Sequence, residues 1–185
     1  NDFEINIIPN ETGSMSDIDS AIIVSSKKLK KSVLNINDCI YNKSHFEKIL
    51  NLKNKLNTEI SLFCLGYTGA GPYPQTFYSP IIEKDILIKK ADEKKKNFFD
   101  RYKKAIQEIP SVKRLPFAGK YLLSGDLSIL NKFRGVADAL EVKEFDEDAI
   151  VLDDSGNSFF DLEEMIPSNE RLDFYKYPNN VFNNK

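Results

Sequence analysis

The chain is poor in the residues that most often perform catalysis or bind metals. Among its 185 residues there is one histidine, there are two cysteines, and there is no tryptophan. A single histidine, His45, excludes a metal site or an acid–base pair built from several histidines of this chain. Any metal or acid–base chemistry must therefore depend on carboxylates, or on residues that this chain does not contain.

The sequence also lacks an excess of charge and a long apolar run. Its 26 basic and 28 acidic residues nearly cancel, whereas a nucleic-acid-binding domain usually carries a strong basic excess. No apolar run approaches the roughly 18 residues that span a bilayer. Residues 1–9 do not have the pattern of a signal peptide. We therefore expect neither a nucleic-acid partner nor a membrane.

The two cysteines, Cys39 and Cys64, lie in or beside apolar runs. Two thiols are too few for a disulfide framework in a chain of this length, so we expect both to be small buried hydrophobes. This composition favours a reducing, cytoplasmic location. The chain begins without methionine and directly in a strand-like pattern, which suggests a segment of a longer protein.

Hydrophobic periodicity predicts alternating strands and helices. Ser44 and Glu47 have the spacing of a capping box, which predicts a helix start there and makes His45 a partly exposed residue of the first turn. An Asp/Gly/Asn turn at 153–157 predicts a hairpin. In chain order we expect strands at 3–8, 20–26 and 31–37, a helix from 44, a strand at 60–65, a helix at 92–109, a strand at 112–123, a helix at 127–140, and strands at 149–152 and 158–162.

This order predicts an α/β fold, a mixed β-sheet with helices on one face. We expect one α/β domain over residues 1–166 and a polar C-terminal tail over 167–185.

The expected hairpin at 20–37 ends abruptly on Asn37, Asp38 and Cys39. A carboxylate just beyond the end of a buried strand lies at the rim of a sheet, where open α/β sheets often form binding sites. Asp38 is therefore the candidate ligand of a metal ion, and a carboxylate that only caps the next turn is the alternative. Because side chains alternate along a strand, Cys39 should point away from Asp38.

Residues 67–80 combine several prolines, glycines and aromatic residues, which cannot form a regular element. We expect an ordered loop packed over a sheet edge. It either lines a substrate cleft or only covers that edge. The side chains that would bind a substrate are Tyr67, Tyr73, Gln75 and Tyr78.

The run from Val33 to Cys39, together with the partner strand from Asp19 to Val24, resembles the second half of the metallo-β-lactamase fold, in which a strand running into Asn-Asp supplies a metal-bridging aspartate. With 115–119 (Leu-Pro-Phe-Ala-Gly), it is most similar to the branch that includes CMP-N-acetylneuraminate hydroxylase. The resemblance implies half of an αββα sandwich. It also implies a metal-dependent hydrolase that uses zinc, iron or manganese, with Asp38 as a ligand and a sugar-nucleotide or polysaccharide substrate.

The chain departs from that family in three respects: the His-x-His-x-Asp-His motif of the first half is absent, no histidine precedes the strand pair, and the last ligand histidine of many members is missing. A degenerate member that has lost catalysis is one interpretation of these departures. The resemblance therefore implies a C-terminal half that is completed by an N-terminal half or by a second copy, and that binds little metal alone. The alternative is a non-catalytic interaction module, in which the aromatic loop and an exposed sheet edge bind a protein.

Overall fold

The computed structural model describes residues 2–10, 19–37, 39, 41–117, 119–152 and 158–170. A five-stranded sheet has the order β1-β2-β3-β4-β5, built from β1 (Phe3–Pro9), β2 (Ser20–Ser26), β3 (Lys31–Asn37), β4 (Glu59–Gly66) and β5 (Lys113–Phe117). The first three strands form an antiparallel meander, and β4 and β5 continue the sheet in parallel with β3. The expected mixed α/β fold is confirmed.

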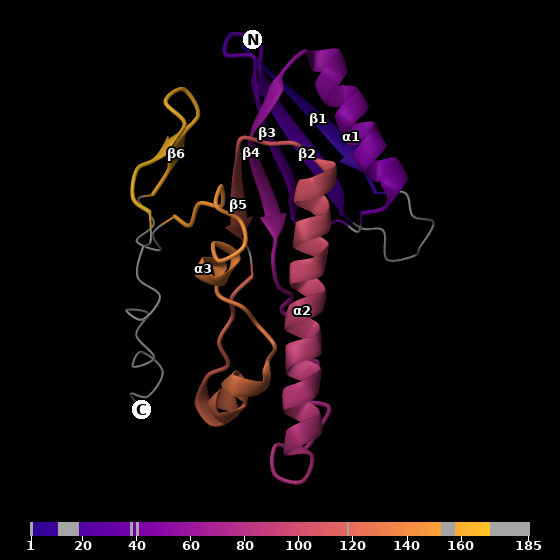
Figure 1. Ribbon diagram of the computed structural model, residues 1–185, viewed down its shortest axis with the longest axis vertical. Helices are drawn as coiled ribbons and strands as arrows, with labels where there is room; N and C mark the ends of the chain where they lie inside the picture. The colour runs from indigo at the N-terminus through magenta and orange to yellow at the C-terminus, as the bar shows by residue number, and fades with distance from the viewer. Residues whose placement is uncertain are drawn as a thin grey trace.

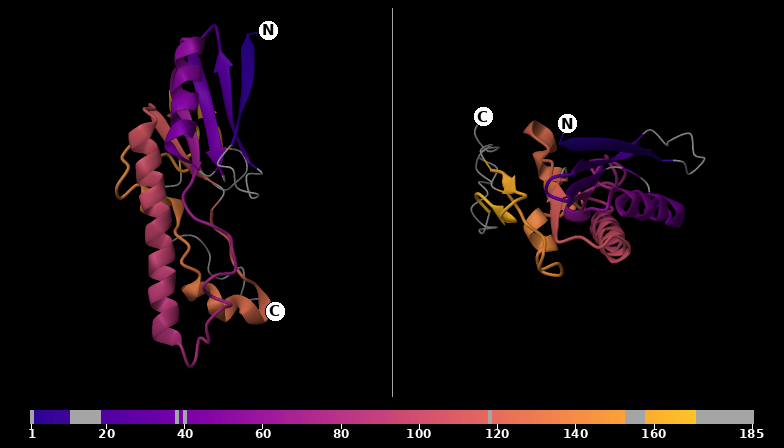
Figure 2. Two further views of the ribbon diagram at one scale, coloured as in Figure 1. Left: turned by 90° about the vertical axis from the view of Figure 1, so that its right-hand side faces the viewer. Right: turned by 90° about the horizontal axis from the view of Figure 1, so that it is seen from above.

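Two long helices connect the parallel strands and lie on the same side of the sheet (Figure 1; Figure 2). They are α1 (Lys43–Leu56), between β3 and β4, and α2 (Lys84–Glu108), between β4 and β5. Both crossovers step along the sheet in one direction, so right-handed connections place both helices on one face. None of the described helices is both long enough and apolar enough to span a membrane.

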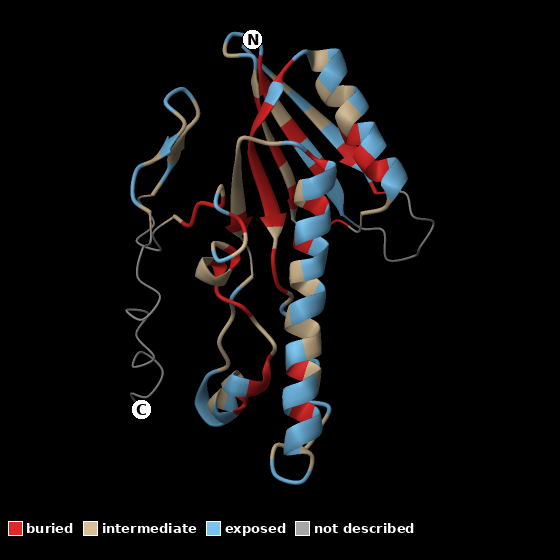
Figure 3. Cartoon of the chain, viewed as in Figure 1, coloured by how far each residue is buried: buried red, intermediate tan, exposed pale blue. Residues whose placement is uncertain are grey.

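The main core lies between this face of the sheet and the helices. Alternation along the strands directs Ile23, Leu34 and Phe63 to that face, where all three are fully buried. From the helices, Phe46, Ile49 and Tyr102 pack against them. Figure 3 shows the buried residues concentrated in the strands and along the inner stripe of α2.

The opposite face of the sheet is covered unevenly. On β4, Leu62 and Cys64 are buried beneath Ile150 and half-buried residues that include Phe160. On β1, by contrast, Phe3, Ile5 and Ile7 are 64–66% exposed.

Several predicted boundaries were wrong. The cap of α1 is Asn42, whose side chain accepts a hydrogen bond from the His45 amide at 3.0 Å, and Ser44 instead donates to that side chain. Helix α2 begins well before residue 92, because Leu87 and Ala91 extend its buried stripe toward the N-terminus.

The predicted helix at 127–140 is instead a 3₁₀ helix, η1 (Gly125–Phe133), followed by a short helix, α3 (Ala139–Val142). Between them, Gly135 has a φ of +61°, which interrupts any continuous helix. η1 contacts the N-terminal half of α2, which extends beyond the sheet (Figure 1).

The predicted hairpin of 149–152 with 158–162 does not form. Instead, Ala149 makes a parallel bridge to Arg114 of β5, and the Ile150 amide donates to the Arg114 carbonyl at 2.8 Å. This pairing forms because the outer edge of β5 offers backbone groups that β4 does not pair. The later strands form their own small sheet, β6 (Phe160–Asp161) with β7 (Ile166–Pro167). The turn at 153–157 and the tail after 170 lie outside the described residues.

Candidate functional site

A cavity of about 510 Å³ opens at the carboxyl ends of β3 and β4. Because β3 and β4 are parallel, both end at this edge of the sheet, and the segments that follow them line the cavity together with α1 and α2. The volume is within the range of small-molecule pockets. Its walls come from the ends of β3 and β4 and from both helices: Cys39, Tyr41, Phe46, Leu65, Gly66, Thr68, Gly69, Phe98, Arg101, Tyr102, Lys104 and Ala105.

Aromatic rings form much of the wall and are held by specific contacts. Tyr41 and Phe46 pack with ring centroids 5.6 Å apart, and the Tyr41 hydroxyl donates to the Ile36 carbonyl at 2.9 Å. Gly69 lies so close to Phe98 that a Cβ at this position would be 2.4 Å from the ring. These contacts define a stacking surface beside the strand ends.

Besides the hydroxyls of Tyr41 and Tyr102, which donate to groups of the protein, the polar groups of the cavity are one further hydroxyl, a thiol and two cations. The hydroxyl of Thr68 is buried and has no hydrogen-bond partner among the described residues. Arg101 and Lys104 project from α2, and the Arg101 guanidinium lies 5.4 Å from the centroid of the Phe98 ring. A cavity with aromatic walls, a free hydroxyl and two cations suits an aromatic or sugar-containing ligand that carries negative charge. We did not predict Arg101 and Lys104 from the sequence, although their spacing of three residues on a helix is a usable signal.

The predicted metal ligand, Asp38, lies outside the described residues, so this assignment stays a prediction. Its neighbours are described: Asn37 is the last residue of β3, and Cys39 lines the cavity. Among the described residues, no group of three or more histidine, cysteine, aspartate or glutamate side chains could hold a metal ion. The described part of the chain therefore does not provide a complete ligand set.

The four predicted substrate-binding residues lie in two places. Tyr67 is buried in the main core, next to the cavity residues Thr68 and Gly69. Tyr73 and Tyr78 lie farther along the loop, with ring centroids 6.2 Å apart. The Gln75 amide donates to the Tyr121 hydroxyl at 2.8 Å. The loop packs against α2 and residue 121 and not over a sheet edge; the Lys94 ammonium donates to the Tyr73 carbonyl at 2.8 Å.

His45 and the two cysteines are buried. His45 is not partly exposed as predicted, because its Nε2 reaches the Pro9 carbonyl at 3.0 Å and fixes the ring against the end of β1. Cys39 and Cys64 are buried in apolar clusters, as predicted, and form no disulfide with each other. Burial raises the pKa of the Cys64 thiol to about 12, so it is not a nucleophile at neutral pH.

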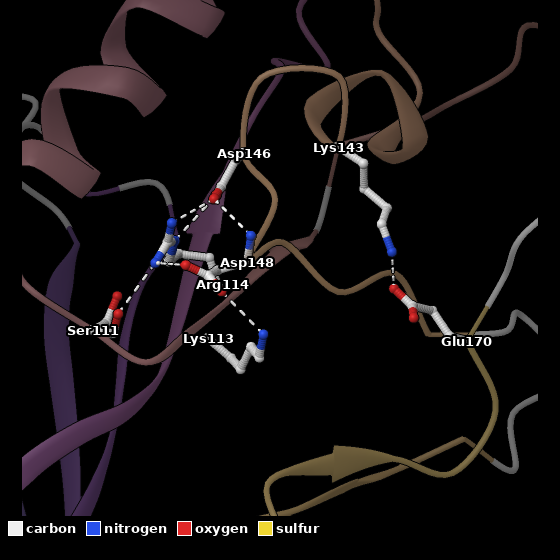
Figure 4. Close-up of polar contacts among 7 residues, drawn as sticks. All are labelled: Ser111, Lys113, Arg114, Lys143, Asp146, Asp148 and Glu170. Atoms are coloured by element: carbon white, nitrogen blue, oxygen red, sulfur yellow. Dashed lines mark hydrogen bonds and ion pairs between the residues drawn. The ribbon is translucent and has the colours of Figure 1, made fainter.

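A buried ion pair, which the sequence did not reveal, joins β5 to the segment after α3 (Figure 4). Arg114 donates through both Nε and Nη2 to the Asp146 carboxylate, and the Tyr102 hydroxyl donates to the same group at 2.9 Å. Asp148 adds a second carboxylate, 3.2 Å from Arg114 Nη1. Every charge in this network has a partner, which indicates a structural role.

Comparison of the chain with family models, with curated proteins and with solved structures gives no match. The arrangement of the chain's own residues therefore carries the functional argument.

Proposed function

We propose that this chain is the C-terminal half of a metal-dependent hydrolase of the metallo-β-lactamase fold, with its active site at the carboxyl ends of β3 and β4. The observation that carries the proposal is the exposed apolar face of β1 and β2. Soluble proteins rarely leave such a sheet face in water. In an αββα sandwich, a second sheet packs against this face.

The position of the cavity supports the same proposal. The family resemblance assigns the metal-bridging carboxylate to Asp38, and the next residue, Cys39, lines the cavity. The absent half would supply the histidine ligands, because the described residues do not form a complete set. Bound divalent metal would supply hydroxide at neutral pH.

This chain's own residues would bind and orient the substrate. Tyr41 and Phe46 offer a stacking surface, Thr68 offers a hydroxyl, and Arg101 and Lys104 attract negative charge. This set is compatible with a sugar-nucleotide, which combines rings with phosphates. Tyr67, Tyr73, Gln75 and Tyr78 stay candidates for the remainder of the cleft.

A non-catalytic interaction module is the second candidate, favoured by a different observation. The surface at the end of the aromatic loop carries Phe77, which is 65% exposed, and the next two residues after the loop, Ile81 and Ile82, are 88% and 87% exposed. Apolar side chains this exposed often mark a protein-binding surface.

Metal analysis separates the two candidates. It is made on the longest soluble product of the reading frame that contains this chain. For the hydrolase, we expect at least one equivalent of zinc, iron or manganese per chain, and loss of metal and turnover in Asp38→Ala. The matched control is Asp19→Ala, which removes an exposed carboxylate from the residue immediately before β2. A metal-free product, or equal metal content in Asp38→Ala and wild type, would refute the hydrolase proposal and favour the interaction module.

A further inference from the structure

Arg134, immediately after η1, is a buried cation. It is 8% exposed, and its Nε donates to the Asn131 carbonyl at 2.8 Å. Its Nη1 is buried without a hydrogen-bond partner among the described residues. The guanidinium carbon lies 5.1 Å from the centroid of the Tyr121 ring. Among the described residues, this charge therefore contacts a carbonyl and an aromatic face but no carboxylate.

Lys94 on α2 brings a second positive charge to the same place. Its ammonium donates to the Tyr73 carbonyl at 2.8 Å and approaches the Gly71 carbonyl at 3.4 Å. Burial, followed by the nearness of Arg134, lowers the pKa of Lys94. Burial also lowers the pKa of Arg134, and the nearby Tyr121 opposes that effect in part.

Two neutral polar side chains complete the cluster. The Gln75 amide donates to the Tyr121 hydroxyl, which in turn donates to the Gly71 carbonyl at 3.1 Å. The Gln75 side-chain oxygen is buried and has no partner in the described part of the chain. The cluster therefore joins the aromatic loop, α2 and the segment around residue 121.

The contrast with Arg114 shows what this cluster lacks. Arg114 is also largely buried, but two carboxylates, Asp146 and Asp148, neutralise it. A buried charge without a counterion is strongly unfavourable, and buried polar groups in native proteins are nearly always satisfied. Two adjacent cations that no described carboxylate neutralises are therefore the arrangement expected of a site that binds an anion.

We propose that Arg134 and Lys94 form a binding subsite for a phosphoryl group, positioned by Tyr121 and Gln75. A phosphate monoester carries close to two negative charges at neutral pH, which matches the two cations, whereas a carboxylate would leave one of them unpaired. Arginine supplies directed donors to phosphate oxygens, and lysine supplies a point charge. The proposal needs no metal and is independent of the hydrolase proposal.

The test is titration of the chain with inorganic phosphate and with methyl phosphate at about pH 8, where both are largely dianionic. Ionic strength is held constant with chloride. Calorimetry measures the affinity, and the NMR signal of the Arg134 side-chain NεH reports the site. We expect saturable binding of both probes and a shift of that signal. Lys94→Gln should weaken binding about tenfold, because it removes a charge-assisted hydrogen bond. Lys96→Gln, which removes the same charge from an exposed position of α2, should leave the affinity unchanged.

Arg134→Met provides a second measurement that does not depend on binding. If the cation is uncompensated, this variant should fold, lose phosphate binding and be at least as stable as the wild type without phosphate. Three results would overturn the proposal. They are no saturable phosphate binding, equal binding of acetate and methyl phosphate, or a marked loss of stability in Arg134→Met without phosphate, since that loss would show a partner within the protein.

Discussion

Ile5 of β1 and Val24 of β2 lie directly opposite each other in antiparallel register, on the sheet face that neither α1 nor α2 covers. Ile5 is 66% exposed, whereas Ile8, on the opposite face of the same strand, is buried in the core. A solvated antiparallel face normally carries polar residues. The apolar side chains of Phe3, Ile5 and Ile7 on β1 are therefore typical of a buried interface, although they are exposed to solvent.

The first prediction concerns this face. Ile5→Ala should change the free energy of unfolding of the present chain by less than about 0.5 kcal/mol, because the side chain is mostly in water. The matched variant Ile23→Ala, at a fully buried position on the other face, should cost about 2–5 kcal/mol. Urea denaturation measures both values.

In the longest product of the reading frame, Ile5→Ala should become clearly destabilising, because the proposed second sheet buries the side chain. An equally small effect in that product would show that nothing packs on this face.

The second prediction concerns the buried ion pair. Asp146→Asn should destabilise the chain by about 3 kcal/mol, because it leaves Arg114 buried beside a neutral amide. Tyr102→Phe should cost about 1–2 kcal/mol through the loss of its hydrogen bond to Asp146. Chemical denaturation followed by circular dichroism provides the measurement.

Glu147→Gln is the control for Asp146→Asn, since it removes the same charge from the adjacent, exposed position. The ion pair would not be a stabilising contact if the two variants were equally stable.

The third prediction is a pH dependence from Asp148. A hydrogen bond from Lys113, assisted by the charge of Arg114, holds the pKa of Asp148 below its ordinary value of 3.8. The unfolded chain therefore binds this proton at higher pH than the folded chain, and the contribution to stability is complete above the unfolded value. It is lost as the pH falls through the folded value.

Asp148→Asn should therefore be less stable than the wild type at neutral pH, by no more than about 1 kcal/mol because the carboxylate is half exposed. The difference should disappear between about pH 5 and pH 2. Unfolding curves at several pH values test this, and a difference that grows in acid would contradict it.

The fourth prediction concerns the contact between α2 and the residue that follows Arg134. Gly135 has a φ of +61°, and a Cβ there would lie 2.3 Å from the Ala91 carbonyl oxygen. Gly135→Ala should therefore destabilise the chain by more than about 1 kcal/mol. Gly125, at φ +58°, has no atom within 4 Å of such a Cβ, so Gly125→Ala should cost only the backbone strain, about 1 kcal/mol.

Thermal unfolding compares the two variants. Equal losses would mean that the close approach to Ala91 contributes nothing beyond backbone conformation.

Local patterns were sufficient where neighbouring residues decide the structure. The apolar runs at 20–26 and 31–37, with a short polar turn between them, predicted the hairpin of β2 and β3, because these two strands pair through neighbouring residues. The apolar run at 60–65 likewise predicted β4 as a buried strand. Prediction failed where a distant residue supplied the partner: Ala149 pairs with Arg114 of β5, and not with the strand that follows its own turn.

The sites show the same division. The sequence indicated the end of β3 as a site and selected Gln75 and three tyrosines from the aromatic loop by residue type. It did not indicate Arg101 and Lys104 at the cavity, or Lys94 beside Arg134, because each pairing requires α2 to pack against a segment far away in the chain.

By itself, the sequence determined the mixed α/β class, the order of the first five strands along the chain and the burial of both thiols. Hydrophobic periodicity and turn residues suffice for these features because they act over a few neighbours. Only the tertiary structure decided which charges are compensated. Arg114 and Arg134 are the same type of residue. Folding places the carboxylates of Asp146 and Asp148 beside Arg114, but it places a second cation, Lys94, beside Arg134. Charge compensation depends on distances through space, which no local pattern encodes.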